Sequence, residues 1–223
     1  MKEHGRRVRE HFDGEARTFD AHYDAAPAGF LDRVVDRAFR TQRLNERLDL
    51  VIEACRGATS ILEVGSGSGR VTVAIAQAVP DARVTGIDFS GEMNDLARAW
   101  AEGGGVGDRC EFIDGDFLTH DFKADSFDVV VAPGVFDYIL QPGPALRCLC
   151  DLASTRVGAS FPARYRLLMP VRWARLESQH CPVRFYARGE LEAMAGATGA
   201  EIRQLDDQGS WISGWYWLVL GTG

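Results

Sequence analysis

The sequence predicts an α/β fold built around a mostly parallel sheet, and three observations indicate it. After residue 60, short apolar runs alternate with helix-like or loop segments. A glycine-rich turn follows the first of these runs, and two strand-like segments close the chain. Alternation of this kind is typical of a parallel sheet covered by helices on both faces. A chain of 223 residues is long enough for one such well-buried domain.

The N-terminal part of the chain is expected to form helix rather than sheet. Between Phe30 and Cys55 the apolar residues recur mostly at three- and four-residue spacing, which predicts one face of a long helix. A second stripe carries arginines interleaved with acids, at Arg33, Arg37, Arg40, Arg43 and Arg47. We interpret this stripe as a solvated, salt-bridged helix face rather than an anion site. Residues 1–55 are therefore assigned to an N-terminal helical cap segment and residues 56–223 to the core.

The strands of the sheet are expected where apolar runs occur, at 60–64, 83–88, 109–113, 127–133 and 156–161. After an irregular stretch, a helix is expected from Arg188 to a glycine stop at Gly199. The closing segments, AEIRQLDD and WISGWYWLVLG, are strand-like and are joined by a short polar turn. We expect them to form an antiparallel hairpin on the edge of the sheet.

Composition and charge limit the partners of the chain. The net charge of -7 argues against nucleic acid or an anionic membrane as a partner. The N-terminus is charged and lacks the apolar segment of a secretory signal, and no apolar run approaches the ~20 residues of a membrane span. The five cysteines are scattered and favour neither a disulfide framework nor a metal site. We therefore expect a cytoplasmic monomer or homodimer with no metal ion.

The glycine turn EVGSGSGR indicates a nucleotide-like ligand. A dinucleotide fingerprint, G-x-G-x-x-G, would need its third glycine where Arg70 stands. A phosphate-binding P-loop is excluded because no Gly-Lys-Ser/Thr follows. Glu63 precedes the turn at the carboxyl end of the first strand, where its charge would repel a pyrophosphate and attract an ammonium or sulfonium. The alternative role for Glu63 is to cap local backbone amides.

Further acids follow the second and third strands. Asp88 is positioned to accept both hydroxyls of a ribose, with Phe89 and Met93 against a purine. Asp116 can accept from an exocyclic adenine amine, while the Phe117 backbone amide meets a ring nitrogen. Each acid alone could be a helix cap or a turn residue. We expect them to converge with the acid before the glycine turn, because ligands of open α/β sheets gather beyond the carboxyl ends of the strands.

Four successive motifs, ILEVGSGSGRVTVAIA, VTGIDFSGEMNDLA, CEFIDGDFL and SFDVVVAPGVFDYI, resemble those of class I S-adenosylmethionine-dependent methyltransferases. The resemblance is strongest over residues 48–161. It implies a Rossmann-like, mostly parallel sheet of seven strands whose last strand is antiparallel, with helices on both faces. It also implies S-adenosylmethionine as the cofactor, lying across the glycine turn.

The resemblance assigns roles to the residues around that turn. The groups that would hold the methionine end of the cofactor are Glu63, Gly65, Ser66 and Gly67, with backbone carbonyls of Ala132 or Pro133 approaching the amino group. The ribose and adenine roles stay with Asp88, Phe89, Met93, Asp116 and Phe117. Tyr23, in the N-terminal segment, would lie over the cofactor.

The candidate catalytic residues lie where the substrate must enter. Methyl transfer depends mainly on holding nucleophile, methyl and sulfur in line, and a base is needed only for an acceptor with a high pKa. Asp137 and Tyr138 follow the fourth strand, within side-chain reach of a methyl on the sulfonium, and His180 is a further candidate. His22 is assigned to substrate binding or to service as a base. A loop, cap or surface role is the alternative for each.

The connection after the fifth strand is longer than such a connection needs, and residues 162–187 are assigned to a substrate lid. Arginines far outnumber acids in this segment, and aromatic residues are interleaved with them. The residues assigned to substrate binding here are Arg164, Arg172, Arg175 and Tyr186. They indicate a flat or anionic small molecule, since arginine pairs well with carboxylate or phosphate. The alternative is a surface insertion whose arginines pair with acids elsewhere.

The sequence thus predicts a methyltransferase that acts on a small, carboxylate-bearing metabolite, with oxygen favoured over nitrogen and carbon as the acceptor. GVFDYI, ASFPAR and CPVRFYARGELE look most similar to small bacterial methyltransferases of secondary metabolism, with fainter similarity to magnesium-protoporphyrin O-methyltransferases. Two other classes stay open. One is a nicotinamide-dependent oxidoreductase, against which Arg70, Glu63 and the Asp116 motif argue. The other is a protein that binds S-adenosylmethionine without transferring its methyl group.

Overall fold

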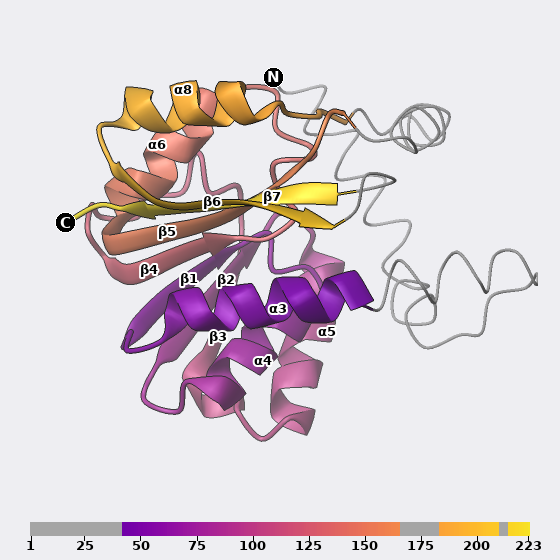
Figure 1. Ribbon diagram of the computed structural model, residues 1–223. Helices are drawn as coiled ribbons and strands as arrows, with labels where there is room; N and C mark the ends of the chain where they lie inside the picture. Colours follow the sequence, from indigo (N-terminus) through magenta and orange to yellow (C-terminus); the bar gives the residue numbers. More distant parts are fainter. Residues whose placement is uncertain (1–41, 166–182, 210–213) are drawn as a thin grey trace, which may run out of the picture.

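The computed structural model describes residues 42–165, 183–209 and 214–223, with side chains from residue 47 onward. One mixed sheet spans this part of the chain (Figure 1). Its strands are β1 (Ser60–Val64), β2 (Arg83–Asp88), β3 (Cys110–Asp114), β4 (Phe127–Ala132), β5 (Ala153–Pro162), β6 (Glu201–Gly209) and β7 (Gly214–Gly221). The spatial order of the seven strands is β3-β2-β1-β4-β5-β7-β6.

The pairing of the strands confirms the predicted fold class. β1 to β5 pair in parallel with their neighbours, and β7 runs antiparallel to both β5 and β6. The apolar runs locate the strands well, but β5 starts earlier than predicted, at Ala153, which pairs with Phe127 of β4. The predicted hairpin is also present. It places β6 at the edge and inserts β7 into the sheet, so every residue of β7 is buried.

Helices cover both faces of the sheet, as predicted. They are α3 (Gln42–Cys55), α4 (Arg70–Ala78), α5 (Gly91–Gly103), α6 (Pro142–Leu152) and α8 (Arg188–Thr198), with a short 3-10 helix η2 (Gly107–Arg109) before β3. Figure 1 shows α6 and α8 on one face and α3, α4 and α5 on the other. The predicted boundary between segments 1–55 and 56–223 stays a prediction. Within the described part, α3 contributes Val51 and Cys55, both fully buried, to the core.

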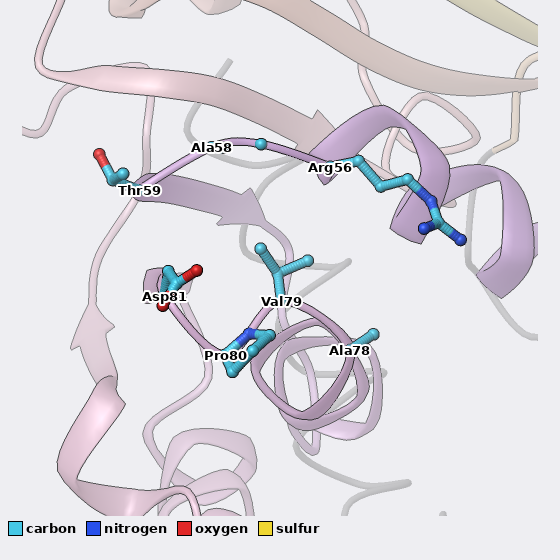
Figure 2. Close-up of a pocket in the computed structure, with 8 residues that line it drawn as sticks. Arg56, Ala58, Thr59, Ala78, Val79, Pro80 and Asp81 are labelled. Atoms are coloured by element: carbon cyan, nitrogen blue, oxygen red, sulfur yellow. The ribbon is translucent and has the colours of Figure 1, made fainter.

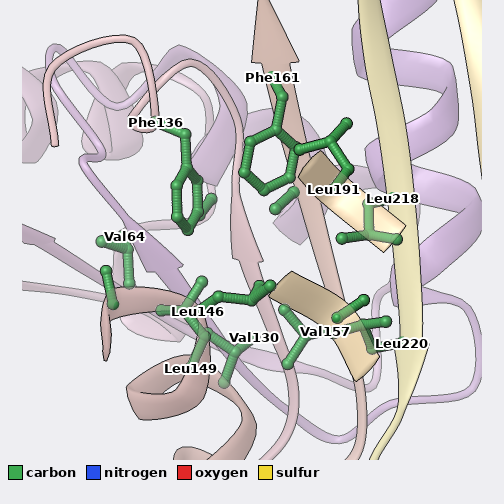
Figure 3. Packing of buried hydrophobic residues seen from close by; sticks show 14 of the residues in the cluster. Val64, Val130, Phe136, Leu146, Leu149, Val157, Phe161, Leu191, Leu218 and Leu220 are labelled. Carbon is green, nitrogen blue, oxygen red and sulfur yellow. The ribbon is translucent and has the colours of Figure 1, made fainter. Parts of the chain in front are cut away.

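Each face of the sheet has its own hydrophobic core. Under α6 and α8, Phe136 and Phe161 pack beside leucines and valines of the strands and helices (Figure 3). On the opposite face, Val51 and Ala97 belong to a second cluster that also contains the tryptophans of β7. Burial on this scale is the main source of stability for such a domain. The two cores hold the carboxyl ends of the strands in place.

The strand order creates a crevice at a defined point. β1 and β4 are neighbouring parallel strands, although β2 and β3 lie between them in sequence. Successive strands are added on one side of β1 up to β3 and on its other side from β4 onward, so the strand order reverses between β1 and β4. Ligands of such sheets bind in the crevice beyond the carboxyl ends of the strands on either side of this point. The glycine turn after β1 and the loop after β4 therefore border the predicted cofactor site.

Candidate functional site

The glycine turn after β1 requires left-handed backbone at three positions. Gly65, Gly67 and Gly69 have φ values of 72°, 50° and 80°, which L side chains rarely adopt. The turn is held to β2 by the amide of Gly65, which donates to the Ile87 carbonyl at 2.8 Å. A Cβ atom built at Gly67 meets nothing within 4 Å. The backbone of Gly67 is therefore open to a ligand.

Gly69 allows the turn to approach α5 closely. A Cβ atom at Gly69 would lie 2.7 Å from the Ala97 Cβ and 2.8 Å from its Cα. The third glycine of the turn, Gly69, therefore allows close packing against α5. It stands one position before Arg70, the residue at which α4 begins. The Arg70 guanidinium instead lies over the Trp100 ring of α5, 4.9 Å from its centroid.

Glu63 is a buried acid at the end of β1. Its side chain is 1% exposed and accepts a hydrogen bond from the Thr72 hydroxyl of α4. The pKa of the Glu63 carboxyl is raised to about 8, mainly by burial; hydrogen bonds from Thr72 lower it, and the nearby Asp88 carboxylate raises it. The Thr72 backbone amide also hydrogen-bonds to this carboxyl and lowers its pKa, so the alternative role considered from sequence, a cap of local backbone amides, is supported as well. Glu63 is thus poised to ionise when a cation approaches.

Asp88 links the end of β2 to the glycine turn. One carboxylate oxygen accepts from the Gly67 amide at 3.0 Å, and the other accepts from the Ser90 amide at 2.9 Å. Ser90 caps α5 by accepting from the Met93 amide. The carboxylate still has lone pairs for ribose hydroxyls, because each oxygen can accept more than one hydrogen bond.

Asn94 joins the ends of β2 and β3, and the sequence analysis missed it. Its fully buried amide donates to the Asp88 carbonyl at 3.1 Å, the Ile113 carbonyl at 3.2 Å and the Asp114 carboxylate at 2.6 Å. The available signal was a polar residue among the buried positions of α5, beside Met93 and Ala97. A buried amide on an apolar helix face predicts backbone partners, because it would otherwise lack hydrogen bonds.

The predicted adenine residues differ in exposure. Met93 is almost fully buried, and Phe89 is half-buried beside Asp88. Asp116 is exposed, and its carboxylate accepts from the Leu118 amide at 3.0 Å in the turn after β3. The Phe117 side chain packs in the core under α6, which leaves its backbone for the predicted role. Their contacts with adenine stay predictions.

The loop after β4 lies directly against the glycine turn. A Cβ atom at Gly65 would come within 2.6 Å of a Val135 methyl carbon, so glycine is required where the two loops meet. The Gly134 amide donates to the Ser160 hydroxyl of β5 at 2.8 Å, and Ser160 is buried. Ala132 is fully buried and Pro133 is half-buried. Their carbonyls are thus carried by a loop that borders the turn, as their predicted role requires.

Asp137 and Tyr138 continue this loop. Asp137 is 7% exposed, and its carbonyl accepts from the Arg184 amide at 2.8 Å. Tyr138 is half-buried, and its amide donates to the Val135 carbonyl. The loop after β4 is therefore clamped by the returning end of the predicted lid, at Arg184. The catalytic roles of both residues stay predictions.

The structure places Tyr186 in the core instead of on the surface of the crevice. Its side chain is fully buried, its hydroxyl donates to the Phe136 carbonyl at 2.9 Å, and its ring packs edge-on against Phe161. Burial raises the pKa of the Tyr186 hydroxyl above its ordinary range. In place of the predicted substrate contact, the geometry gives Tyr186 a packing role that supports the loop after β4.

Arg164 marks the point where the predicted lid segment leaves the core. The isolated bridge between Ala163 and Tyr186 holds the start and end of residues 162–187 side by side. The Arg164 guanidinium pairs with Glu190 of α8 at 2.8 Å and donates to the Phe185 carbonyl. Its substrate role stays a prediction. The other predicted residues of the lid and N-terminal segment lie outside the described residues, namely His22, Tyr23, Arg172, Arg175 and His180.

A surface hollow lies far from these groups, where α3 leads into β1 and α4 leads toward β2 (Figure 2). It is bordered by residues 56–59 and 78–81, at the amino ends of the strands. No predicted site residue lines it. Among the residues that the structure describes, no group of three or more His, Cys, Asp and Glu side chains could hold a metal ion. No helix within the same ranges is long and apolar enough to cross a membrane.

Residues 61–154, which contain the turn and all three acids, match the profile of a family described as a methyltransferase domain. This segment is a methyltransferase domain. Over 85 residues, this chain is 42% identical to release factor glutamine methyltransferase from Chlorobaculum tepidum; the match covers 38% of this chain and 27% of that protein. Over 100 residues, it is 33% identical to trans-aconitate 2-methyltransferase from Streptomyces avermitilis; this match covers 45% of this chain and 37% of that protein. The chain thus spans less than half the length of these relatives.

Solved structures extend the likeness beyond the methyltransferase domain to almost the whole chain. Magnesium protoporphyrin IX methyltransferase from Synechocystis, solved with bound SAH, superposes with a TM-score of 0.75 over 97% of this chain and 98% of its own, at 18% identity. The [4+2]-cyclase SpnF superposes with a TM-score of 0.69 over 81% of both chains, at 19% identity. The fold around the methyltransferase domain is therefore the class I S-adenosylmethionine-dependent methyltransferase fold.

Proposed function

We propose that the protein is an S-adenosylmethionine-dependent methyltransferase that methylates a small, carboxylate-bearing metabolite, at oxygen in preference to nitrogen or carbon. The observation that supports the cofactor most is the placement of Glu63 and Asp88 on one glycine turn. Glu63 is the penultimate residue of β1, Asp88 is the last residue of the neighbouring strand β2, and the Gly67 amide of the turn donates to the Asp88 carboxylate. A pyrophosphate would meet the Asp88 carboxylate and oppose the ionisation of Glu63, whereas a sulfonium favours ionised Glu63 and a ribose can donate to Asp88.

The donors and open backbone of the turn fit this cofactor. The Ser66 hydroxyl is buried and has no hydrogen-bond partner among the described residues. It is backed by Gly86 of β2, where a Cβ atom would come within 2.8 Å of Ser66. A polar ligand over the turn would satisfy this hydroxyl, since buried polar groups are rarely left without partners.

When bound, S-adenosylmethionine supplies a methyl group on an activated sulfonium. The residues of the chain bind, orient and exclude water around it. Desolvated Glu63 favours a cationic ligand, and Asp88 holds the turn while it accepts from the ribose. Asp137 sits at 7% exposure in the loop after β4, where a carboxylate can orient the acceptor or take its proton. The chain would accelerate the reaction mainly by aligning the acceptor, the methyl group and the sulfur.

We propose that the substrate carries a carboxylate because Arg184 lies beside the loop after β4. The Arg184 guanidinium lies 5.4 Å from the centroid of the Tyr186 ring, and the Arg184 amide binds the Asp137 carbonyl. Arg164, Arg172 and Arg175 are proposed to join it from the segment between residues 162 and 187. One relative is named for trans-aconitate, which is a carboxylate. A role in secondary metabolism remains part of the proposal.

Two other functions have specific support. A magnesium-porphyrin carboxyl methyltransferase is favoured by the superposition over 97% of the chain, and its substrate would present propionates to the same arginines. The porphyrin enzyme is thus the second candidate function, and a protein of this fold that does not transfer methyl groups is the third, since a cyclase shares the architecture. A nicotinamide-dependent oxidoreductase lacks such support, because the turn carries two acids and Arg70.

Methyl transfer can be tested with S-adenosylmethionine labelled on its methyl group. The purified protein is incubated with hydroxy and phenolic carboxylates, their methyl esters and amides, and magnesium protoporphyrin IX. We expect label on one or more free carboxylates and none on the matched amides. Label on the porphyrin alone would favour the second function. No transfer to any compound, by a protein that binds S-adenosylhomocysteine, would contradict the proposed methylation and favour the third.

Asp137→Asn serves as a matched variant in the same assay. It should lower turnover strongly and leave the affinity for S-adenosylhomocysteine within about twofold, because Asp137 is proposed to act on the acceptor. The opposite pattern would move Asp137 to the cofactor side.

A further inference from the structure

One short segment, residues 184–186, holds both peptide groups that flank Asp137. The Tyr186 hydroxyl donates to the Phe136 carbonyl, in the peptide group before Asp137, at 2.9 Å. The Arg184 amide donates to the Asp137 carbonyl, in the peptide group after it, at 2.8 Å. A residue has only two soft backbone dihedrals, so fixing the peptide groups on both sides of its Cα atom also fixes the direction of its Cα–Cβ bond. The segment therefore sets the direction in which the Asp137 side chain leaves the loop.

Tyr186 is itself fixed to the end of β5. Its amide donates to the Pro162 carbonyl at 2.9 Å, and its carbonyl accepts from the Arg164 amide at 2.8 Å. Its ring is fully buried and packs edge-on against Phe161, with the ring centroids 5.2 Å apart. Phe161 also contacts Phe136, with the centroids 4.4 Å apart (Figure 3). The Tyr186 hydroxyl is thus held in place by the backbone and the core of the sheet.

The loop that Tyr186 holds lies against the glycine turn. Val135 precedes Phe136, and a Cβ atom built at Gly65 of the turn would come within 2.6 Å of a Val135 methyl carbon. The methionine end of the cofactor, which carries the sulfonium, is proposed to lie over this turn. A shift of the loop would therefore move Asp137 relative to the methyl group. Methyl transfer depends mainly on alignment, so such a shift would slow it.

We infer that Tyr186 is a positioning residue for methyl transfer, which acts by fixing the backbone that presents Asp137 to the acceptor. This inference rests on the proposed function. Tyr186 acts on the backbone alone, so its role is independent of the contacts that the Asp137 carboxylate makes within the chain. The role requires no contact between Tyr186 and the substrate, which agrees with the full burial of its side chain.

The test is a double-mutant cycle of Tyr186→Phe and Asp137→Asn. Methyl transfer is followed from labelled S-adenosylmethionine to the hydroxy or phenolic carboxylate that the unaltered protein methylates fastest. Tyr186→Phe keeps the buried ring and removes only the hydrogen bond to the Phe136 carbonyl. We expect it to lower kcat about tenfold or more, because misplacement by about 1 Å can slow a reaction about 100-fold. In the Asp137→Asn background it should lower kcat by less than about twofold, because the residue that it positions is already lost.

Calorimetric titration with S-adenosylhomocysteine separates positioning from folding. The number of sites gives the fraction of protein that is folded, and kcat is calculated per site. Tyr186→Phe should leave the affinity within about twofold. Tyr216→Phe is the matched control, since Tyr216 lies in the same core opposite Phe161 and its hydroxyl makes no hydrogen bond within the described part of the chain. This variant should keep kcat within about twofold.

Four results would overturn the inference. If Tyr186→Phe reduced the number of sites but left kcat per site unchanged, Tyr186 would serve folding alone. Equal losses of kcat in both backgrounds would show that Tyr186 does not act through Asp137. An unchanged kcat for Asp137→Asn would leave Tyr186 with no reactive side chain to position. If the unaltered protein transferred no methyl group, the proposed function itself would fail, and the inference with it.

Discussion

The carboxylate of Asp88 accepts a hydrogen bond from the backbone amide of Gly67 at 3.0 Å. One acid at the end of β2 therefore holds open the turn that follows β1, and it does so from the side where a ribose is expected. Function and local stability are joined in this residue, because a ligand that uses Asp88 binds to a side chain that already orders its site.

Asp88→Asn should weaken binding of S-adenosylhomocysteine by at least about tenfold. The amide keeps one acceptor but loses the charge, and hydrogen bonds to charged groups contribute about 1.5–3 kcal/mol. Calorimetric titration measures the affinity. Asp114→Asn is the matched control, since Asp114 ends β3 and binds Asn94 rather than the turn. A loss for Asp88→Asn that is no larger than for this control would contradict the ribose role.

Glu63→Gln should change how stability depends on pH. The folded pKa of Glu63, about 8, lies above its ordinary value of 4.5. The folded state therefore holds a proton that the unfolded chain releases, and this contribution to stability is complete below about pH 4.5 and is lost as pH rises through 8. Glutamine cannot ionise. As the pH rises from 5 to 8.5, the melting temperature of Glu63→Gln should therefore increase relative to that of the unaltered protein. If the melting temperatures of the two proteins changed with pH in parallel, a buried, proton-binding Glu63 would be contradicted.

Cofactor binding should release a proton from the same residue. A cationic ligand favours ionised Glu63, so the affinity for S-adenosylmethionine should rise from about pH 6.5 to 8.5. Titrations in buffers with different ionisation enthalpies measure the protons released. Glu63→Gln should release fewer, and an unchanged number would assign the proton to another group.

Gly69→Ala should destabilise the fold by more than about 2 kcal/mol. The substitution forces an L side chain to φ 80° and presses its Cβ onto the backbone of Ala97. Urea denaturation gives the free energy of unfolding. Gly196→Ala is the control, because Gly196 is an exposed position of α8 with nothing within 4 Å of a built Cβ. That change should be neutral or stabilise by up to about 1 kcal/mol. Similar values for both variants would refute the close contact.

Asn94→Asp should destabilise more than Asn94→Ala. Alanine removes the donor that serves the ends of β2 and β3, at a cost of about 1–3 kcal/mol. Aspartate adds a buried negative charge next to Asp114 and two carbonyl oxygens, which offer it no hydrogen. Denaturation at pH 7.5 compares the two. If aspartate were tolerated as well as alanine, the amide would not be the group that matters.

The sequence predicts the sheet and the residues of the glycine turn well, because these depend on local patterns. Apolar runs mark the buried strands, and positive φ values explain the glycines of the turn. It predicts less well the residues whose role depends on tertiary contacts. Arg47 belongs to a charged helix stripe, and only the position of Trp215, far along the chain, shows that it turns inward. Tyr186 lies in an arginine-rich stretch but packs on Phe161. Neither contact has a local signature.

The measurement that tests the cofactor assignment most directly is calorimetric titration of the purified protein with S-adenosylmethionine, S-adenosylhomocysteine and NADH. The acids at the ends of β1 and β2, with Asp116 beyond β3, predict binding of the first two and none of NADH. Binding of NADH without the other two would contradict the roles given to Glu63, Asp88 and Asp116.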